Sequence, residues 1–504
     1  MFAKKRVPFI LLAVFIGILM VNIDGMIVST AMPTVIAKLG GMNLFSWVTA
    51  AYMLTTTVFI PIFGKLADLY GKKPFILLGL LLFTVASVLC ATADSMTQLI
   101  WYRALQGVGG APLMPLAFAM IFEIIPLEKR GRMQAMFMAT NGIALVAGPQ
   151  VGAWLTEKLS WHWVFLINVP FGIISMLLLA LFYFESSSRK SSRLDLAGFT
   201  ALTISITSLM LALVMGGVDY TWSSWQIILL FAVSVIFLVV FILAEKKASE
   251  PMIPLHLFSR TVVSSTGISF LLGLIMAAAM AYIPMYIQGV AGQSVSRAGN
   301  ALTPLSVTLI FGSMAGSMLQ SRLTFRTSMA VAIVLLGISC GMLYGLTPAS
   351  SHGYVIAAMI VMGAGMGPLF PITMMLMQTS VSREHNSTAT ALVSFFRNIG
   401  LALGSSVFAA IINNRLVHTI QGLPAAKDMN AIQPQALMDT AARARIPAPI
   451  LHVLEQGLNN GIIIVFAAGA AICMAMLALS LLAGKARLEI APSDAKAVKP
   501  QVQQ

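Results

Sequence analysis

Residues 107–115 have the sequence GVGGAPLMP, and residues 363–371 have the sequence GAGMGPLFP. Five of the nine positions recur, at an offset of 256. The segments that follow also match at nearly this offset, because Asn141-Gly142 to Gly148 resembles Asn398-Ile399-Gly400 to Gly404. Two neighbouring matches with a shared offset argue against a chance likeness between glycine-rich segments, and they predict an internal duplication.

The composition around these segments indicates a membrane protein. The chain has 504 residues, of which 58% are hydrophobic and 10% charged, whereas a typical soluble domain has about 25% charged residues. The high fraction of apolar residues excludes a disordered chain, and the low fraction of charged residues argues against a large soluble enzyme. The apolar residues form runs of about 20, the length that crosses a bilayer as a helix. We therefore expect an all-α polytopic membrane protein.

Fourteen membrane-spanning helices are predicted, and the positions of the basic residues support this count. The spans are 8–28, 44–64, 75–94, 98–123, 137–158, 162–183, 197–215, 225–243, 263–287, 299–320, 328–348, 353–378, 388–413 and 461–483. Of the 31 Lys and Arg residues, 22 fall on the side of the termini, seven on the other side and two within spans. The positive-inside rule then puts both termini in the cytoplasm, and it accounts for the net charge of +14 without a nucleic-acid partner.

The repeat predicts how the helices are grouped. Spans 4 and 5 match spans 12 and 13, so the shift is eight helices, which leaves six helices, an inserted pair and six more. Two parallel halves of this kind are a transporter architecture with the substrate site between them near the midplane. The predicted units are 1–190, 191–260, 261–484 and a tail at 485–504. The long outer loop 414–460 is expected to be a partly helical external cap, with a functional lid as the alternative.

Asp24 and Arg103 are charged residues inside predicted spans. A charge at mid-membrane costs about 2.5–3.5 kcal/mol, so such residues are functional candidates. Burial favours the uncharged form of Asp24, which suits a proton carrier. Asp24 lies about 24 Å along its span from Pro8, and Arg103 lies about 8 Å from the outer end of its own span, so their depths nearly coincide. A structural acid near the outer interface and simple charge neutralisation are the alternative interpretations.

Arg397 lies inside span 13, although spans 9 to 13 contain no acid. It must face polar groups or a cavity. Gln288, Asn300, Gln378 and Asn398 are possible partners. An anionic group of a substrate and the carbonyls of a helix are both possible contacts. The full set of candidates for the substrate cavity is Asn22, Tyr52, Gln106, Asn141, Gln150, Tyr282, Tyr286, Gln288, Arg397 and Asn398.

Two further segments are expected to govern conformational change. Residues 64–73, GKLADLYGKK, join spans 2 and 3, and their glycines permit a tight turn. Asp68 can cap a neighbouring helix or pair with Arg130 or Arg132. The glycines and the proline of span 5 allow close helix packing and a bend, either as a static seam or as a hinge. The gating candidates are Gly64, Asp68, Gly71, Lys72, Lys73, Arg130, Gly142, Gly148, Pro149 and Gly152.

Together these motifs resemble the major facilitator superfamily, in particular its 14-spanner drug:proton antiporter branch. The resemblance rests on residues 64–73, 103–110, 142–152, 161–170 and 24–33. In the last of these, Asp24 is kept, while Met26, Ser29, Thr30 and Met32 depart from the usual pattern, and Ala153 replaces the second of two glycines at the end of the span-5 motif. The resemblance implies two six-helix bundles plus two inserted helices. It also implies proton-coupled export of amphipathic, cationic or neutral drug-like compounds, with Asp24 as the acid for which protons and substrate compete and Arg103 modulating its proton affinity.

These features predict a transporter of the bacterial cytoplasmic membrane, driven by the proton motive force, with no cofactor, metal site or catalytic residue. Its partners would be the lipid bilayer, protons and amphipathic small molecules. It would act as a monomer or with a periplasmic adaptor. No phosphate-binding G-x-x-x-x-G-K-[ST] loop is present in the sequence. Export of one specific metabolite, peptide, lipid or siderophore is the alternative, and a transporter-like sensor or a membrane enzyme has less support.

Overall fold

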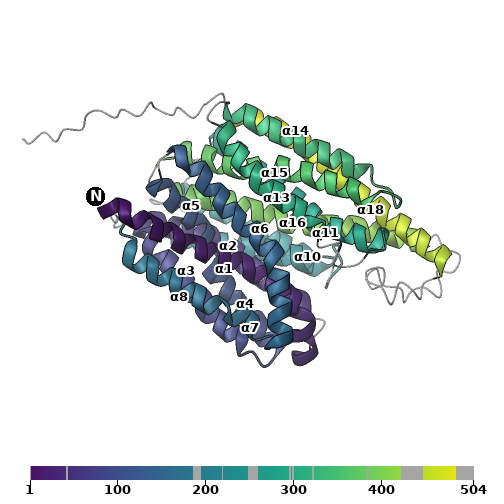
Figure 1. Ribbon diagram of the computed structural model, residues 1–504, viewed down its shortest axis with the longest axis horizontal. Coiled ribbons are helices and arrows are strands. Elements are labelled where there is room, and N and C mark those ends of the chain that lie inside the picture. The colour runs from purple at the N-terminus through teal and green to yellow at the C-terminus, as the bar shows by residue number, and fades with distance from the viewer. Residues whose placement is uncertain are drawn as a thin grey trace, which may run out of the picture.

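The computed structural model describes residues 2–483 apart from 41–43, 126, 186–194, 218, 248–258, 294–296, 298–299, 321–322, 383–384 and 422–446. Long helices run roughly side by side through the molecule (Figure 1). In chain order they are α1 (Phe2–Leu39), α2 (Phe45–Tyr70), α3 (Lys72–Ala91), α4 (Met96–Gly110), α5 (Leu113–Ile124), α6 (Leu127–Lys158), α7 (Trp163–Leu166), α8 (Asn168–Phe182), α9 (Leu196–Met215), α10 (Trp225–Lys247), α11 (Arg260–Met285), α13 (Leu302–Leu319), α14 (Phe325–Tyr344), α15 (His352–Thr379), α16 (Asn386–Gln421) and α18 (Ala448–Ser480), with a π-helical turn at Tyr286–Val290 and a 3-10 turn at Leu481–Ala483.

Within the described residues, 13 helical segments are long and apolar enough to cross a membrane, and each coincides with a predicted span. The remaining predicted span, 137–158, lies inside α6 and is not among the 13. Its mean hydropathy is lower because polar residues, glycines and a proline interrupt the apolar ones. Helix α6 packs against α1 and α13, so much of its surface contacts protein instead of lipid.

Several boundaries differ from the prediction for identifiable reasons. Helix α2 continues through Gly64 to Tyr70, so the expected turn consists of Gly71 alone, whose φ of 97° favours glycine. The fourth span breaks into α4 and α5 at Pro112, which lacks a backbone N–H. The outer loop 414–460 is shorter than expected, because α16 extends to Gln421 and α18 begins at Ala448. The expectation of a lid falls largely on 422–446, outside the described residues.

The repeat in the sequence is also a repeat of packing. A Cβ added at Gly109 of α4 would lie 2.4 Å from the backbone nitrogen of Phe83 in α3. A Cβ added at Gly365 of α15, 256 positions later, would lie 2.5 Å from the backbone nitrogen of Leu336 in α14. Both glycines therefore permit the same close backbone approach. The contact of α3 with α4 recurs as the contact of α14 with α15.

The helices form two groups that meet along matching seams. In Figure 1, α3, α4 and α8 lie on one side of the molecule and α14, α15 and α18 on the other. Helix α2 packs against α16, and α6 packs against α13. The repeat pairs α2 with α13 and α6 with α16, so each seam corresponds to the other. This correspondence is expected for two halves related by a pseudo-two-fold axis.

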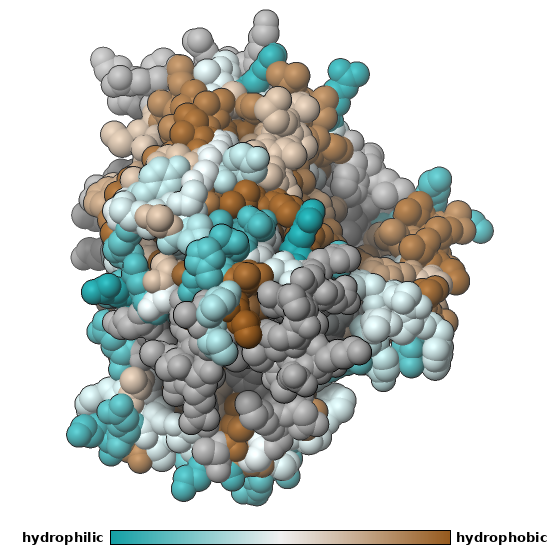
Figure 2. All heavy atoms as spheres, turned by 90° about the vertical axis from the view of Figure 1, so that its right-hand side faces the viewer, coloured by the Kyte–Doolittle hydropathy of each residue, from teal (hydrophilic) through white to brown (hydrophobic). Residues whose placement is uncertain are grey.

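The inserted helices α9 and α10 pack against each other, and α9 also contacts α2 and α16. Seen from the right-hand side of Figure 1, the face opposite the N-terminus has polar residues mainly on its left and at its bottom and hydrophobic residues mainly at its top and on its right (Figure 2). Two of the predicted boundaries, near residues 190 and 484, lie outside the described residues.

Candidate functional site

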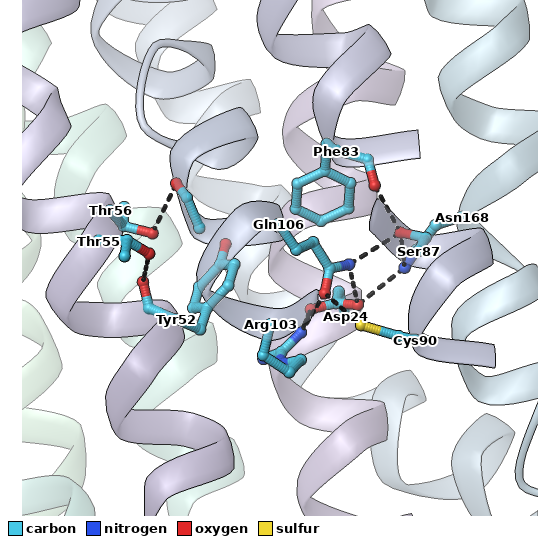
Figure 3. Close-up of polar contacts among 11 residues, drawn as sticks. Asp24, Tyr52, Thr55, Thr56, Phe83, Ser87, Cys90, Arg103, Gln106 and Asn168 are labelled. Atoms are coloured by element: carbon cyan, nitrogen blue, oxygen red, sulfur yellow. Dashed lines mark hydrogen bonds and ion pairs between the residues drawn. The ribbon is translucent and has the colours of Figure 1, made fainter. Parts of the chain in front are cut away.

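A cluster of polar side chains is buried among four helices near the middle of α1. Asp24 of α1, Ser87 of α3, Arg103 and Gln106 of α4, and Asn168 of α8 are each at most 1% exposed. Figure 3 shows the last three side chains converging on the carboxylate of Asp24. The similar depths of Asp24 and Arg103 in the sequence correspond to a direct contact in the structure.

Three donors hold the Asp24 carboxylate. Nη1 of Arg103 lies 2.6 Å from Oδ2, while Nε2 of Gln106 and Nδ2 of Asn168 lie 3.0 and 2.7 Å from Oδ1. The same Nη1 donates to Oε1 of Gln106 at 2.7 Å. A buried ion pair persists only where further hydrogen bonds offset its desolvation, and this network supplies them.

Ser87 completes the network from α3. Its hydroxyl oxygen accepts hydrogen bonds from Nε2 of Gln106 at 2.8 Å and Nδ2 of Asn168 at 3.2 Å. Its own proton goes to the backbone carbonyl of Phe83 at 2.8 Å. Ser87 therefore keeps both amide groups pointed toward Asp24.

Close packing of α2 on α4 positions the cation. The guanidinium of Arg103 lies 4.4 Å from the centre of the Tyr52 ring, a cation–π contact. Gly107 permits this approach, since a Cβ there would lie 2.4 Å from the carbonyl oxygen of Tyr52. The hydroxyl of Thr55 donates to the carbonyl of Ala104 at 2.8 Å and ties the two helices together.

The glycines of α6 connect this cluster to a second helix. A Cβ at Gly148 would lie 2.5 Å from Cβ of Met26, and one at Gly152 would lie 2.5 Å from Oγ1 of Thr30. On the other side of Asp24, Nδ2 of Asn22 donates to Oγ1 of Thr140 in α6 at 2.8 Å. Helix α6 thus contacts α1 on both sides of Asp24.

The remaining span-5 candidates differ in their surroundings. Gly142 faces the other half, where a Cβ would lie 2.6 Å from Cδ1 of Ile310 in α13. Gln150 is exposed. Asn141 and Pro149 lie in α6, but their side chains are outside the described part of the chain, as is that of Arg130.

A contact between the halves closes the end of the bundle that holds the N-terminus. Asp68 accepts hydrogen bonds from the backbone nitrogens of Ser387 and Thr388, at 2.9 and 2.7 Å. It therefore caps the start of α16, one of the two roles expected for it. Gly64 does not form a turn; a Cβ there would lie 2.5 Å from Cβ of Ala391, so this glycine permits α2 to touch α16.

Lys72 and Lys73 are gating candidates, and their described contacts lie within the N-terminal half. Their backbone nitrogens donate to the carboxylate of Glu185, at 2.7 and 3.2 Å. The ammonium of Lys72 pairs with Glu123, and that of Lys73 donates to the carbonyl of Ala180 at 2.9 Å. These lysines fasten α3 to neighbouring helices.

Two cavities lie between the halves. The outer one has a volume of about 1260 Å³ and is lined by residues from α2, α9, α11 and α16. Its α2 residues are in the first half of that helix, so it lies away from the closed contact at Gly64 and Asp68. The central cavity, of about 190 Å³, is lined by Met26, Met114 and Gly142 from one half and by residues such as Phe370 from the other. Met280 lines both cavities.

The structure brings only some of the predicted substrate candidates to these cavities. Arg397 lines the central cavity and Asn398 the outer one. Within the described part of the chain, neither lining includes Asn22, Tyr52, Gln106, Gln150, Tyr282, Tyr286 or Gln288. The hydroxyls of Tyr282 and Tyr286 donate to the backbone carbonyls of Ser405 and Thr347, at 3.4 and 2.7 Å. Tyr282 thus links α11 to α16, and Tyr286 links the π-helical turn to the loop after α14.

Sequence reasoning missed Ser87, Asn168 and Glu185. Asn168 and Ser87 each interrupt an apolar run, so their polarity was a usable signal. Their partners could not be deduced, because a hydrogen bond over 144 positions, as between Asn168 and Asp24, depends on the packing of whole helices. Glu185 follows a span and resembles any loop acid in the sequence.

Comparison with known proteins identifies the family. The sequence model that represents the Major Facilitator Superfamily matches residues 14–405 of this chain. The chain is 37% identical over 496 residues to multidrug resistance protein 3 of Bacillus subtilis, covering 96% of this chain and 97% of that protein. It is also 37% identical to the multidrug transporter protein MdtP of the same species, covering 83% and 79%. The crystal structure of the human organic anion transporter MFSD10 (TETRAN) superposes with a TM-score of 0.62 at 13% identity, covering 94% and 99%.

Proposed function

The chain belongs to the major facilitator superfamily, and from this premise we propose that it exports amphipathic drug-like compounds in exchange for protons. It acts as a transporter and not as an enzyme. The observation that carries the proposal is the ion pair of Asp24 and Arg103, which is fully buried among membrane-spanning helices. Ionisable groups in such a position are characteristic of proton pathways.

Protonation of Asp24 would change the network in a defined way. A neutral carboxyl no longer attracts Arg103, whose guanidinium keeps its charge and its bond to Oε1 of Gln106. The new O–H needs an acceptor. Oδ1 of Asn168 is buried and, within the described residues, has no hydrogen-bond partner. A reorientation of this amide would let Oδ1 accept a hydrogen bond from the protonated carboxyl of Asp24. Binding and release of one proton would thereby switch the contact between α1 and α4.

The substrate acts on this switch through α1. Among the described residues, Asp24 lines neither cavity, whereas Met26, two positions along the same helix, lines the central one. Gly148 of α6 packs on Met26. A substrate in the central cavity would therefore press on the segment that carries Asp24, and a proton on Asp24 would alter the same segment from the other side. We infer that proton and substrate compete through the position of α1, without sharing one contact.

Alternating access follows from the two ends of the α2 and α16 seam. This seam is closed at Asp68 and Ser387 and hollowed toward the opposite end by the outer cavity. With both termini in the cytoplasm of a bacterium, this arrangement would be the outward-open state. Rocking of the halves would break the Asp68 cap and close the outer cavity.

The proton gradient is a sufficient energy source for such export. One proton that moves down about 150 mV releases about 3.5 kcal/mol. At about 1.4 kcal/mol per decade, this supports a substrate gradient of a few hundred-fold. The two Bacillus subtilis relatives are named as a multidrug resistance protein and a multidrug transporter, and these names support the proposal that the cargo is a varied set of small molecules.

Transport into inverted membrane vesicles with an acidified lumen tests the proposal. We expect wild-type protein to accumulate amphipathic dyes such as 8-anilinonaphthalene-1-sulfonate only while the gradient lasts. The Asp24→Asn variant should lose gradient-driven accumulation while it still exchanges dye. Asp94→Asn, which removes an exposed carboxylate from the loop before α4, should match the wild type.

Two outcomes would each contradict one part of the proposal, the coupling role of Asp24 or the varied cargo. Undiminished gradient-driven accumulation by Asp24→Asn would remove the coupling role from this acid. If the wild type moves none of a broad dye panel, while cells without it accumulate a single metabolite, the protein exports one specific cargo.

A further inference from the structure

Arg397 carries a charge in the membrane that the proton network does not use. It is the twelfth residue of α16, which places it about 17 Å along that helix, near the middle of a bilayer about 30 Å thick. Its side chain lines the central cavity between the halves. A charge in this position needs a compensating partner or a function.

Two of the four expected partners of Arg397, Gln378 and Asn398, lie in other surroundings. Nε2 of Gln378 donates to Thr390 at 3.3 Å, and Asn398 lines the outer cavity. The guanidinium of Arg397 lies 5.1 Å from the centre of the Phe370 ring. Among the side chains and carbonyls that the structure describes, it makes neither a hydrogen bond nor an ion pair. The ring stabilises the cation in part but leaves the donor groups of the guanidinium unused.

The cavity walls supply no negative charge. The central cavity is lined by Met26, Met114, Met276 and Met280 together with leucines, Gly142, Ser306 and Phe370. Arg397 is the one charged residue in the described linings of the central and outer cavities. A guanidinium stays protonated in proteins. Its field in such apolar surroundings attracts anions strongly and repels cations.

We propose that the central cavity binds the anionic head group of an amphipathic substrate, with Arg397 as the residue that holds it. A carboxylate or sulfonate matches the paired donors of a guanidinium. The apolar body of the substrate would lie on the methionines, which adapt to varied shapes, and extend past Met280 toward the outer cavity. This inference rests on the proposed export function. It changes the charge class of the cargo from the cationic or neutral compounds expected by resemblance to anionic ones.

Binding of three probes that share one fluorophore tests the charge preference. Dansylate is anionic, dansylamide neutral and dansylcadaverine cationic. We expect purified wild-type protein, without any gradient, to bind dansylate at least about tenfold more tightly than dansylcadaverine. Arg397→Met should abolish this preference, and Arg397→Lys should keep most of it. Dansylamide should bind all three proteins within about twofold, because it lacks a charge for Arg397 to recognise.

Two further variants separate a local charge effect from damage to the fold. Met280→Glu supplies a carboxylate on the cavity wall and should abolish the preference for dansylate even though Arg397 is present. Arg415→Met removes an exposed charge from the same helix and should change nothing. Displacement of dansylate by decanoate in preference to phosphatidylglycerol would assign the site to free anions, and the reverse would assign it to lipid head groups.

The proposal is overturned if the wild type binds dansylcadaverine as tightly as dansylate, if it binds none of the three probes, or if Arg397→Met keeps the preference. These readouts are independent of the export function, because they need no gradient. A charge preference in binding without gradient-driven efflux would support the anion site and contradict the proposed function.

Discussion

Asn168 shows how far the site depends on one amide side chain. Its Nδ2 lies 2.7 Å from Oδ1 of Asp24, and it donates to the carboxylate. A hydrogen bond to a charged group contributes about 1.5–3 kcal/mol. Its loss would leave the buried ion pair of Asp24 and Arg103 with less compensation for its desolvation.

We therefore expect Asn168→Ala to lower the rate of gradient-driven efflux by about tenfold or more. Dye accumulation in the inverted vesicles measures this loss. Ser175→Ala is a matched control, because Ser175 of the same helix donates to the carbonyl of Ala13 in α1 and does not touch Asp24. Gradient-driven efflux at the wild-type rate in Asn168→Ala would show that coupling does not need this donor.

Residue types in the sequence predicted the centre of the site but not its periphery. Asp24 and Arg103 could be identified because a charge in an apolar run is costly, and their depths followed from counting residues along the spans. The direction in which each side chain points depends on how its helix is rotated about its own axis. The faces of these helices differ little in hydrophobicity, so the sequence does not specify this rotation. The sequence therefore does not reveal that the hydroxyls of Tyr282 and Tyr286 donate to backbone carbonyls of Ser405 and Thr347.

Among the helices, the contact between α2 and α16 is the element on which closure depends. The carboxylate of Asp68 satisfies two backbone N–H groups at the start of α16, where no residue of α16 itself could supply a charge. This capping interaction crosses from one half to the other. It therefore stabilises the state in which that end is closed.

Asp68→Ala should weaken this closure. The loss of a cap costs about 0.5–2 kcal/mol, so we expect the amides of Ser387 and Thr388 to exchange hydrogen several-fold to about thirty-fold faster. Hydrogen–deuterium exchange of α16 measures the change. Asp195→Ala removes a cap within α9, where Asp195 accepts from the nitrogen of Gly198, and should leave these two amides unaffected. Equal exchange in wild type and Asp68→Ala would exclude the cap as part of the closed contact.

On the scale of the molecule, thirteen of the fourteen predicted spans coincide with helices long and apolar enough to cross a membrane, within the part of the chain that the structure describes. These spans and the repeat of the two halves could be predicted because they depend on composition and on glycine spacing. The finer breaks were not predictable. Pro112 breaks the fourth span, whereas Pro368, at the matching position, lies within the continuous helix α15. The same residue type thus has different effects in the two halves, depending on its neighbours.

The repeat predicts that both halves respond alike to matched substitutions. Gly109→Ala and Gly365→Ala would each place a methyl group against the backbone of the adjoining helix, which cannot rotate away. We expect each to destabilise the protein by about 1–3 kcal/mol, seen as a lower thermal unfolding temperature in detergent. Gly341→Ala is the control, since nothing lies within 4 Å of its added Cβ. A loss of stability in only one of the two variants would contradict equivalent packing.

The central claim is that Asp24 carries the proton exchanged for substrate. The most direct measurement is the release of protons from purified protein in weakly buffered solution when a transported dye is added. We expect release by the wild type and by Asp94→Asn, and none by Asp24→Asn at a dye concentration that saturates it. Equal release by Asp24→Asn and wild type would contradict this role of Asp24, because the proton would then leave from another group.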